Sequence, residues 1–299
     1  MNRWLRRLFA LALLAAPLLA CAATAIFYQP QLADRRVAES HWPGLFAQAR
    51  ARGFDTVVVQ WVEYGPAFAD QAGRAWLERR VREVRAAGLR VVLGLGSDPA
   101  FFERQHAPED TLEGYLRQLA DRDARLARAW TDELGEDAIA GWYLPLEIDD
   151  VRWRDAEART LLVAHLERER RQLEAVLPRP VYVTSFFAGN MAPAPYTRLL
   201  EQIAATGVRV WVQDGAGTGR LNAGERGLYL AAAQRCGAAP VRGIVYELFR
   251  QTAHDAAFAA EPLAPAEAAP AMAQRAPCGG DSAFFELRYL PGTEALLAR

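Results

Sequence analysis

Short apolar runs of strand length alternate with longer amphipathic stretches along most of the chain, and this alternation is the strongest constraint on its fold. Such alternation predicts parallel strands that are covered by helices. Eight runs qualify as strands, which is the number that a closed (β/α)8 TIM barrel requires. They are residues 26–29, 56–62, 90–95, 140–147, 181–185, 208–213, 243–248 and, with a weaker pattern, 284–290.

The segments between these strands have leucine, valine or alanine at three- and four-residue spacing, with arginine and glutamate between them. This period is typical of helices that pack one apolar face against a sheet. Gly53, Gly88 and Gly207 stand where three of the helices should end. We expect helices over residues 45–52, 75–87, 112–134, 156–176, 196–206 and 227–235.

Residues 261–277 are rich in alanine and proline and have neither period, so we expect a long surface connection there. The sequence contains no recognisable interdomain linker. The fold class is therefore predicted as α/β, with one barrel domain over residues 26–299.

The charged residues exclude several classes of function. The chain has 35 basic and 36 acidic residues, so it offers no positive surplus to a phosphate backbone, and nucleic acid is not an expected partner. Every basic residue is arginine. The absence of lysine excludes Schiff-base aldolases, pyridoxal enzymes and P-loop phosphoryl transfer, which each need a lysine amine.

The first 25 residues have the pattern of a secretory signal peptide: Arg3, Arg6 and Arg7 precede an apolar run over residues 8–20. Export to the periplasm or beyond is therefore expected. The cleavage site has two readings, because residues 18–21 resemble a lipoprotein box that would place a lipid anchor on Cys21, while two A-x-A patterns fit ordinary cleavage. The run is too short for a mature membrane span, and no other segment is longer.

Cysteine and histidine usage points to a disulfide and away from a metal. In an oxidising compartment Cys236 and Cys278 are expected to form one disulfide, the alternative being two unrelated buried thiols. The four histidines are scattered without the spacing of metal ligands. We expect neither a metal nor another cofactor.

Polar and aromatic residues collect where the predicted strands end, which is where a parallel barrel places its active site. Amides and carboxylates bind hydroxyl groups, and rings stack on the apolar face of a pyranose, so this set predicts a carbohydrate partner. Gln60 and Glu63 alternate along one strand, so both cannot point to the same face. The candidate substrate-binding residues are Gln29, Gln60, Trp61, Glu63, Tyr64, Trp142, Ser185, Gln213, Asp214 and Tyr246.

Glu147 and Glu247 are the strongest catalytic candidates, because glycoside cleavage needs two carboxyl groups across the scissile bond. Each also has a structural reading. Glu147 could cap the next helix or pair with an arginine, Glu247 could pair with Arg250, and Asp214 could bond its own turn.

Glutamates that end the fourth and seventh strands resemble the arrangement of a large clan of retaining glycosidases with this barrel. That resemblance implies Glu147 as the acid/base and Glu247 as the nucleophile. The clan usually has asparagine directly before the proton donor, whereas this chain has Leu146.

Four phrases also resemble the DUF4434 family, a group of bacterial barrel proteins considered glycosidase-like: FYQP at residues 27–30, VVQWVEYG at 58–65, GWYLPLEIDD at 141–150 and VQDGAG at 212–217. We therefore expect an exported, glycoside hydrolase-like protein that cleaves a polysaccharide by a retaining mechanism. The alternatives are a non-catalytic carbohydrate-binding or envelope polysaccharide assembly protein, and a metal-dependent barrel hydrolase. The sequence indicates neither the sugar nor the oligomeric state.

Overall fold

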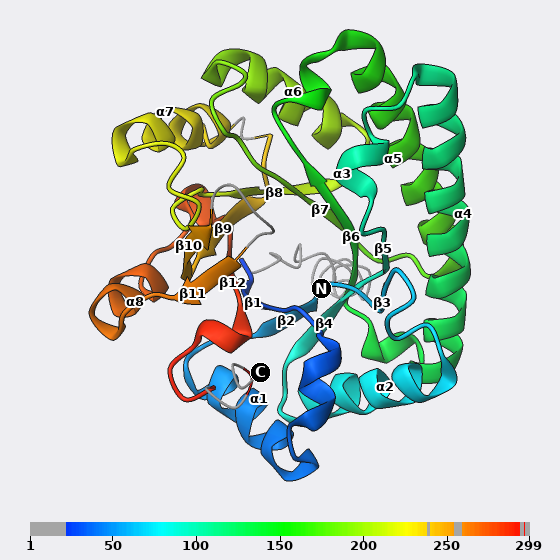
Figure 1. Ribbon diagram of the computed structural model, residues 1–299, viewed down its shortest axis with the longest axis vertical. Coiled ribbons are helices and arrows are strands. Elements are labelled where there is room, and N and C mark those ends of the chain that lie inside the picture. Colours follow the sequence, from blue (N-terminus) through cyan, green and yellow to red (C-terminus); the bar gives the residue numbers. More distant parts are fainter. Residues whose placement is uncertain (1–21, 238–239, 254–258, 294–295, 297–299) are drawn as a thin grey trace, which may run out of the picture.

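The computed structural model describes residues 22–237, 240–253, 259–293 and 296. Eight parallel strands close into a barrel in the order β1-β12-β9-β8-β7-β6-β4-β2 (Figure 1), which confirms the predicted fold class. The chain closes the barrel by pairing its first strand with its last, Thr24 beside Ser282. The barrel strands are β1 (Thr24–Tyr28), β2 (Thr56–Val59), β4 (Arg90–Gly94), β6 (Gly141–Ile148), β7 (Val181–Ser185), β8 (Arg209–Gln213), β9 (Gly243–Glu247) and β12 (Asp281–Phe285).

The helices lie around the outside of the barrel, and all six that were expected are present (Figure 1). Two of them begin four residues earlier than the apolar spacing indicated, because polar side chains cap them: Asp70 accepts the backbone N–H of Gly73 at 2.6 Å at the start of α2, and Asn222 accepts that of Glu225 at 3.1 Å at the start of α7. No helix among the described residues combines the length and hydrophobicity needed to cross a bilayer. The helices are α1 (Trp42–Ala51), α2 (Gln71–Ala86), α3 (Phe101–Arg104), α4 (Glu109–Leu134), α5 (Ala156–Val176), α6 (Pro193–Ala205), α7 (Ala223–Ala233) and α8 (Pro265–Met272).

Two small sheets extend the carboxyl end of the barrel. β3 (Glu63–Tyr64) pairs in parallel with β5 (Gly96–Ser97), and β10 (Phe249–Ala253) pairs antiparallel with β11 (Ala259–Pro262). Both continue from the ends of barrel strands, so they build walls above the barrel interior.

Two sequence predictions near the C-terminus were wrong. Residues 261–277 contain α8, whose first turn is capped by Glu267 accepting the N–H of Ala264 at 3.3 Å. The last strand is residues 281–285 instead of 284–290, because Asp281 anchors its start: one carboxylate oxygen accepts the N–H of Ala23 at 2.9 Å and the other the Trp211 indole N–H at 3.1 Å.

The same anchor moves the start of the barrel. β1 begins at Thr24, two residues before the predicted start at Ile26, because Ala23 is already bonded to Asp281. The predicted signal peptide over residues 1–25 therefore overlaps the first two residues of a barrel strand. Its residues 1–21, with the lipid-anchor candidate Cys21, lie outside the described residues.

Aromatic rings fill the inside of the barrel. Phe27 lies 5.4 Å from Tyr143 and 6.0 Å from Trp211 between ring centroids, and Tyr182 stacks on Trp211 at 4.3 Å. Alternate residues of the same strands point outward into the larger core beneath the helices. The interior below the strand ends is thus packed, and only the carboxyl end is left open to a ligand.

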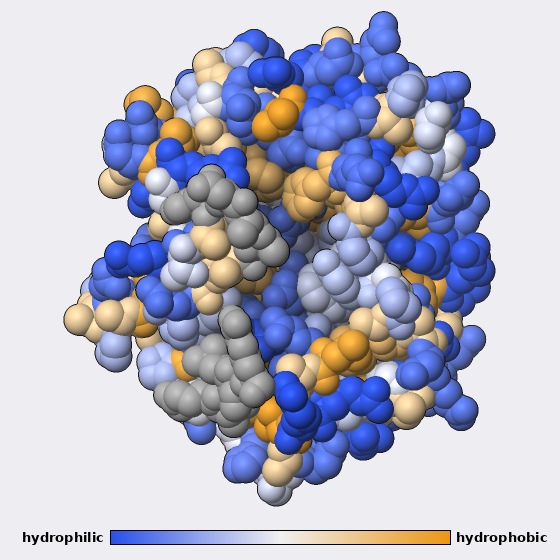
Figure 2. Space-filling view, in the orientation of Figure 1, coloured by the Kyte–Doolittle hydropathy of each residue, from blue (hydrophilic) through white to orange (hydrophobic). Residues whose placement is uncertain are grey.

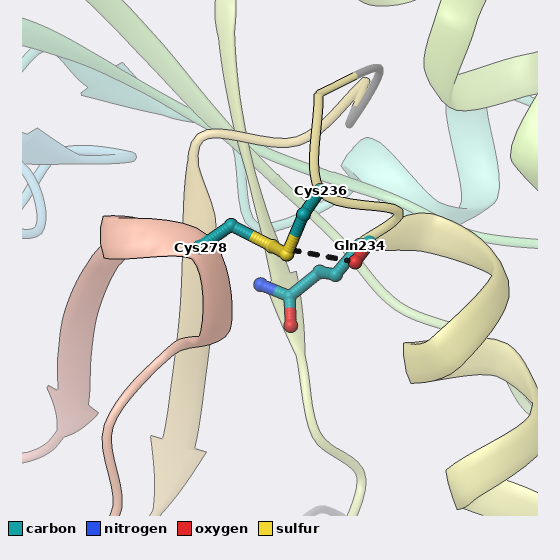
Figure 3. The surroundings of a disulfide bond; sticks show 3 residues. All are labelled: Gln234, Cys236 and Cys278. Carbon is teal, nitrogen blue, oxygen red and sulfur yellow. Dashed lines mark hydrogen bonds between the residues drawn. A yellow bond between two sulfur atoms is a disulfide. The ribbon is translucent and has the colours of Figure 1, made fainter.

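Cys236 and Cys278 form the predicted disulfide, with their Cα atoms 5.3 Å apart (Figure 3). The bond joins the segment after α7 to the segment before β12. Gln234 lies beside it, its carbonyl oxygen 3.7 Å from Cys278 Sγ. Both cysteines precede strands, so the disulfide lies at the amino end of the barrel.

Replacing Cys236 and Cys278 by serine should lower the free energy of unfolding. The bridged residues are 42 apart in sequence, and the chain-entropy relation gives about 4 kcal/mol for a loop of this length. Urea denaturation of the oxidised wild type, the reduced wild type and the double-serine variant measures the change. Equal midpoints for the oxidised and reduced protein would contradict the expected contribution.

Candidate functional site

A cavity of about 600 Å³ lies at the carboxyl end of the barrel strands. Figure 2 views the molecule in the orientation of Figure 1 and shows this face hollowed near its centre, with polar and apolar surface around the hollow. Gln29, Gln60, Gln213, Glu147 and Glu247 contribute to its lining, and each comes from a different strand end.

The placement of these residues follows from the two-residue alternation of a strand. Phe27, Val58 and Trp211 point into the packed interior, so the residues two positions further along, Gln29, Gln60 and Gln213, point the same way just above it. By the same rule, Glu247 points into the barrel like Val245, two residues before it. Glu147 points the same way as Tyr143, which lies four residues, or two full alternations, earlier on β6. Of the candidate residues proposed from the sequence, those that line the cavity are Gln29, Gln60, Trp61, Tyr64, Glu147, Gln213 and Glu247.

Three other candidates lie away from the cavity. Trp142 is buried beneath the helices and donates its indole N–H to the Leu177 carbonyl at 3.2 Å. Ser185 is buried beside the Tyr196 hydroxyl at 2.8 Å, and Tyr246 is part of the same outer core. Each is one residue from an inward-facing position, so its side chain points to the helical layer and is not placed to contact a ligand.

Glu63 and Asp214 also differ from the expectation. Glu63 pairs with Arg74 of α2, with 3.7 Å between Oε1 and Nη2, and does not line the cavity. Gln60, its partner in the predicted alternation, does line it. Asp214 is buried and does not line the cavity; its Oδ1 accepts the backbone N–H groups of Ala216 at 3.1 Å and Glu247 at 3.3 Å.

Trp61 and Tyr64 form a pair of rings on one wall, with centroids 4.7 Å apart. The Trp61 indole N–H donates to the Pro30 carbonyl at 3.1 Å, which fixes the ring plane. Both residues follow β2 and belong to the loop that contains β3.

A buried ionic network holds the neighbouring end of β1. The backbone of Gln29 donates its N–H to Glu286 Oε2 at 2.8 Å and accepts from Arg288 Nη2 at 2.7 Å. Arg288 also bonds Glu286 at 2.5 Å and lies 3.4 Å from Asp34, whose carboxylate accepts the Tyr28 hydroxyl at 3.0 Å. Burial raises the pKa of Glu286 to about 7, although Arg288 acts in the opposite direction. The network therefore fixes the segment that positions both Gln29 and Pro30.

Sequence reasoning identified Tyr64 at the mouth of the cavity but missed two further hydrophobic side chains there, Phe102 and Val151. Tyr64, Phe102 and Val151 are 39%, 46% and 38% exposed, and they are three of the five large hydrophobic side chains exposed among the described residues. Phe102 also packs edge-on against Phe186, with centroids 6.3 Å apart. Phe102 and Val151 belong to loops, where no strand period indicates a direction. The adjacent aromatics Phe101 and Phe102, a few residues after the end of β5 at Ser97, were the one available signal.

Two further carboxylates of the lining are engaged by the protein itself. Asp98 accepts the Tyr115 hydroxyl at 2.8 Å and Arg104 Nη1 at 3.0 Å. Asp149 accepts Gln105 Nε2 at 2.7 Å and the Arg152 N–H at 2.6 Å. These acids hold the loops that follow β5 and β6.

Glu147, in contrast, accepts no hydrogen bond from the described residues and faces the cavity. It neither caps a helix nor pairs with an arginine there. Burial raises the pKa of the Glu147 carboxyl to about 7, because the charged form loses its hydration. The group is thus available to exchange a proton with a ligand near neutral pH.

Glu247 is buried in the lining of the same cavity, and its Oε2 accepts the backbone N–H groups of Gly217 at 2.6 Å and Thr218 at 3.3 Å. Burial raises the pKa of Glu247 to about 8, with further contributions from the charges of Asp214 and Glu147 and opposition from the two N–H donors. Glu147 and Glu247 thus line the same cavity, and the charge of Glu147 adds to the raised pKa of Glu247. Arg250, the alternative partner, pairs with Glu267 at 2.6 Å.

A metal site was not expected, and the described residues contain no group of three or more histidine, cysteine, aspartate or glutamate side chains placed to hold a metal ion. Besides Asp98 and Asp149, the lining offers the carboxyl groups of Glu147 and Glu247 and the side-chain amides of four glutamines, with hydrophobic side chains at the rim. The four glutamines are Gln29, Gln60, Gln213 and Gln251.

Two solved structures share this architecture. A GH18 chitinase from Pseudoalteromonas aurantia superposes with a TM-score of 0.51 at 12% identity, covering 92% of this chain and 98% of that chain. A GH5-4 broad specificity endoglucanase from Clostridium acetobutylicum gives 0.51 at 13% identity, covering 88% of this chain and 87% of that chain. At these identities the likeness shows the fold alone, that of a glycosidase-like TIM barrel.

A nearer relative is the Escherichia coli (strain K12) protein named "Uncharacterized protein YbcH", which is 44% identical over 273 residues, 91% of this chain and 92% of that protein. Residues 24–291 match the family described as "Domain of unknown function (DUF4434)". This match over nearly all of the described residues, together with the 44% identical relative, shows that the chain belongs to the DUF4434 family.

Proposed function

We propose that the protein is a glycoside hydrolase that cleaves a polysaccharide by a retaining mechanism, with Glu147 as the acid/base and Glu247 as the nucleophile. The observation that carries the proposal is the convergence of these two carboxyl groups, from β6 and β9, on one cavity at the open end of the barrel. Asp98 and Asp149 of the same lining use both carboxylate oxygens in hydrogen bonds to the protein. Among the described residues, Glu147 accepts no hydrogen bond, and Glu247 accepts them through Oε2 alone.

The proposed reaction has two steps. In the first, Glu247 forms a bond to the anomeric carbon while the glycosidic C–O bond breaks, and the Glu147 proton passes to the leaving oxygen. In the second, a water molecule loses a proton to Glu147 and attacks the anomeric carbon, which releases the Glu247 carboxylate. The sum is hydrolysis with retention, and both carboxyl groups return to their starting state.

The environments of the two groups support these roles. A proton donor must keep its proton near neutral pH, and burial of Glu147 raises its pKa to about 7. A nucleophile must be ionised, and Glu247 accepts two backbone N–H groups that stabilise the anion. Burial, with the charges of Asp214 and Glu147 added to it, raises the pKa of Glu247 to about 8, above that of Glu147. The nucleophile role therefore rests on the two N–H donors and on the strand position, and not on the order of the two pKa values.

The walls of the cavity support a carbohydrate as the ligand. Gln29, Gln60 and Gln213 offer amide donors and acceptors to hydroxyl groups, and the Trp61–Tyr64 pair offers a ring surface to a sugar. The hydrophobic side chains at the mouth lie beyond the glutamates, where the sugars on either side of a cleaved bond in a polymer would lie.

We also propose that the protein acts outside the cytoplasm. The signal-peptide pattern of residues 1–25 and the disulfide between Cys236 and Cys278 both support export.

Glu147→Gln and Glu247→Gln should each lower turnover by roughly 10²–10⁴-fold, while ligand affinity stays within a few-fold of the wild type. A panel of bacterial polysaccharides, assayed for new reducing ends and by calorimetry, separates turnover from binding. Glu63→Gln is the matched control, because Glu63 lies at the same end of the barrel but outside the cavity, and it should keep wild-type turnover. Binding without turnover in the wild type would indicate a carbohydrate-binding protein instead.

Glu147→Gln should also change how stability depends on pH. The pKa of Glu147 is raised from 4.5 to about 7, so its protonated form stabilises the fold fully below pH 4.5, and this contribution is lost as pH rises through about 7. The variant should therefore lose less stability between pH 5 and pH 9, by about 1–3 kcal/mol. Chemical denaturation at the two pH values measures the difference. Equal losses in both proteins would contradict the raised pKa.

Trp61→Ala should weaken the binding of a substrate oligosaccharide by roughly tenfold, because it removes a stacking surface of about 1–1.5 kcal/mol. Trp61→Phe keeps a ring and should recover part of the affinity. KM or a dissociation constant on the substrate found in the panel gives the readout. An unchanged value in Trp61→Ala would show that this wall does not contact the ligand.

A further inference from the structure

The loop between β8 and α7, residues 214–222, does two things at once. It contributes Gly215, Thr218 and Arg220 to the cavity lining, and it supplies the N–H groups that bind Glu247. The conformation of this loop therefore decides how the Glu247 carboxyl group is oriented.

Asp214 is the residue that fixes the start of the loop. Its side chain is buried, and one oxygen, Oδ1, accepts the N–H of Ala216 at 3.1 Å and the N–H of Glu247 at 3.3 Å. The first bond closes the turn, and the second joins the end of β8 to the end of β9. Asp214 thus connects the loop to the backbone of Glu247, whose side chain accepts the loop N–H groups.

The far side of the loop is fixed by close packing. A Cβ atom on Gly217 would lie 2.6 Å from the carbonyl oxygen of Phe249 and 2.7 Å from its ring, so only glycine fits. Thr218 adds a hydrogen bond from its hydroxyl to the Gly215 carbonyl at 3.3 Å. Held between Asp214 and Phe249, the loop aims the N–H groups of residues 217 and 218 at Glu247.

The two oxygens of Glu247 are consequently in different states. Oε2 accepts both loop N–H groups, whereas Oε1 accepts no hydrogen bond from the described residues. A carboxylate held in this way has one free oxygen in a fixed position.

We propose that Asp214 is a positioning residue, which holds the β8–α7 loop in the conformation that fixes Glu247 Oε2 and leaves Oε1 as the atom that attacks the sugar. The inference rests on the proposed role of Glu247 as the nucleophile. It replaces the direct contact with substrate that the sequence suggested for Asp214.

The charges around Glu247 give a second consequence. Asp214 from β8 and Glu147 from β6 both act on it, while Arg226 of α7 acts on Asp214 in the opposite sense. Asp214→Asn keeps an oxygen acceptor for the two N–H groups but removes the negative charge. The pKa of Glu247 should then fall, because a neighbouring like charge is lost.

Kinetics of Asp214→Ala and Asp214→Asn test the proposal. The alanine variant should lose about 10²-fold in kcat with little change in KM, because the nucleophile is misplaced by a fraction of an ångström to an ångström. The asparagine variant should recover most of kcat, and the acidic limb of its pH profile should move to lower pH by about one unit. Asp155→Ala removes a comparable turn-capping carboxylate on the outside of the barrel and should keep wild-type kcat.

Hydrogen exchange at the Gly217 and Thr218 amides tests the same loop without substrate. Both amides should exchange roughly tenfold or more faster in Asp214→Ala than in Asp214→Asn, because a hydrogen bond to a charged group is lost. Absence of turnover in the wild type would count against the proposed function alone, since exchange does not depend on it. Unchanged exchange in the alanine variant would overturn the role of Asp214.

Gly217→Ala provides an independent route if Asp214→Ala does not fold. The added methyl group must push the loop away from Phe249 while Asp214 remains intact. This variant should reproduce the loss of kcat and the faster exchange at residue 218. Wild-type kcat and exchange in Gly217→Ala, or an acidic limb that does not move in Asp214→Asn, would each overturn the proposal.

Discussion

The filling of the barrel by aromatic rings is the constraint on which the site depends. Phe27, Tyr143, Tyr182 and Trp211 occupy the interior so completely that a ligand can enter only above them. The residues that follow these rings on the same inward-facing rows are then the cavity floor. The packing of these rings therefore determines where a ligand can bind, and the polar side chains at the strand ends determine which ligand.

Above this floor, several residues that line the cavity are fixed by hydrogen bonds to their backbone groups as well as by contacts of their side chains. Gln29 is fixed by Glu286 and Arg288, which bond its N–H and its carbonyl, and Glu247 is fixed through Asp214 by the same kind of contact. Buried charges seldom add net stability. Here Glu286 and Arg288 join the segment after the last strand to the end of the first, and Asp214 joins the loop after β8 to the end of β9.

The sequence was informative where a period or a single chemical need could be read from it. Eight apolar runs gave the barrel, and the need for two carboxyl groups selected Glu147 and Glu247 from the strand ends. It was uninformative about side-chain direction, because barrel strands are apolar on both faces and carry no alternation. Trp142, Ser185 and Tyr246 were chosen one position away from the inward-facing row for this reason. The sequence also did not indicate which loop residues reach the cavity, among them Phe102, Val151 and Arg220. Their positions depend on loop conformations fixed by contacts between distant residues, such as the hydrogen bond between Gln105 and Asp149. The helix α8 has alanine on every side, so no amphipathic pattern could reveal it.

The disulfide occupies the end of the barrel opposite the cavity, among the segments that enter the strands. The aromatic rings that fill the barrel interior therefore lie between the disulfide and the cavity. The oxidation state of the two cysteines can therefore change how well the fold resists unfolding and proteolysis without changing the geometry of the cavity. Substitutions at the amino end of the barrel can then change stability, while substitutions at the carboxyl end change the ligand that is bound.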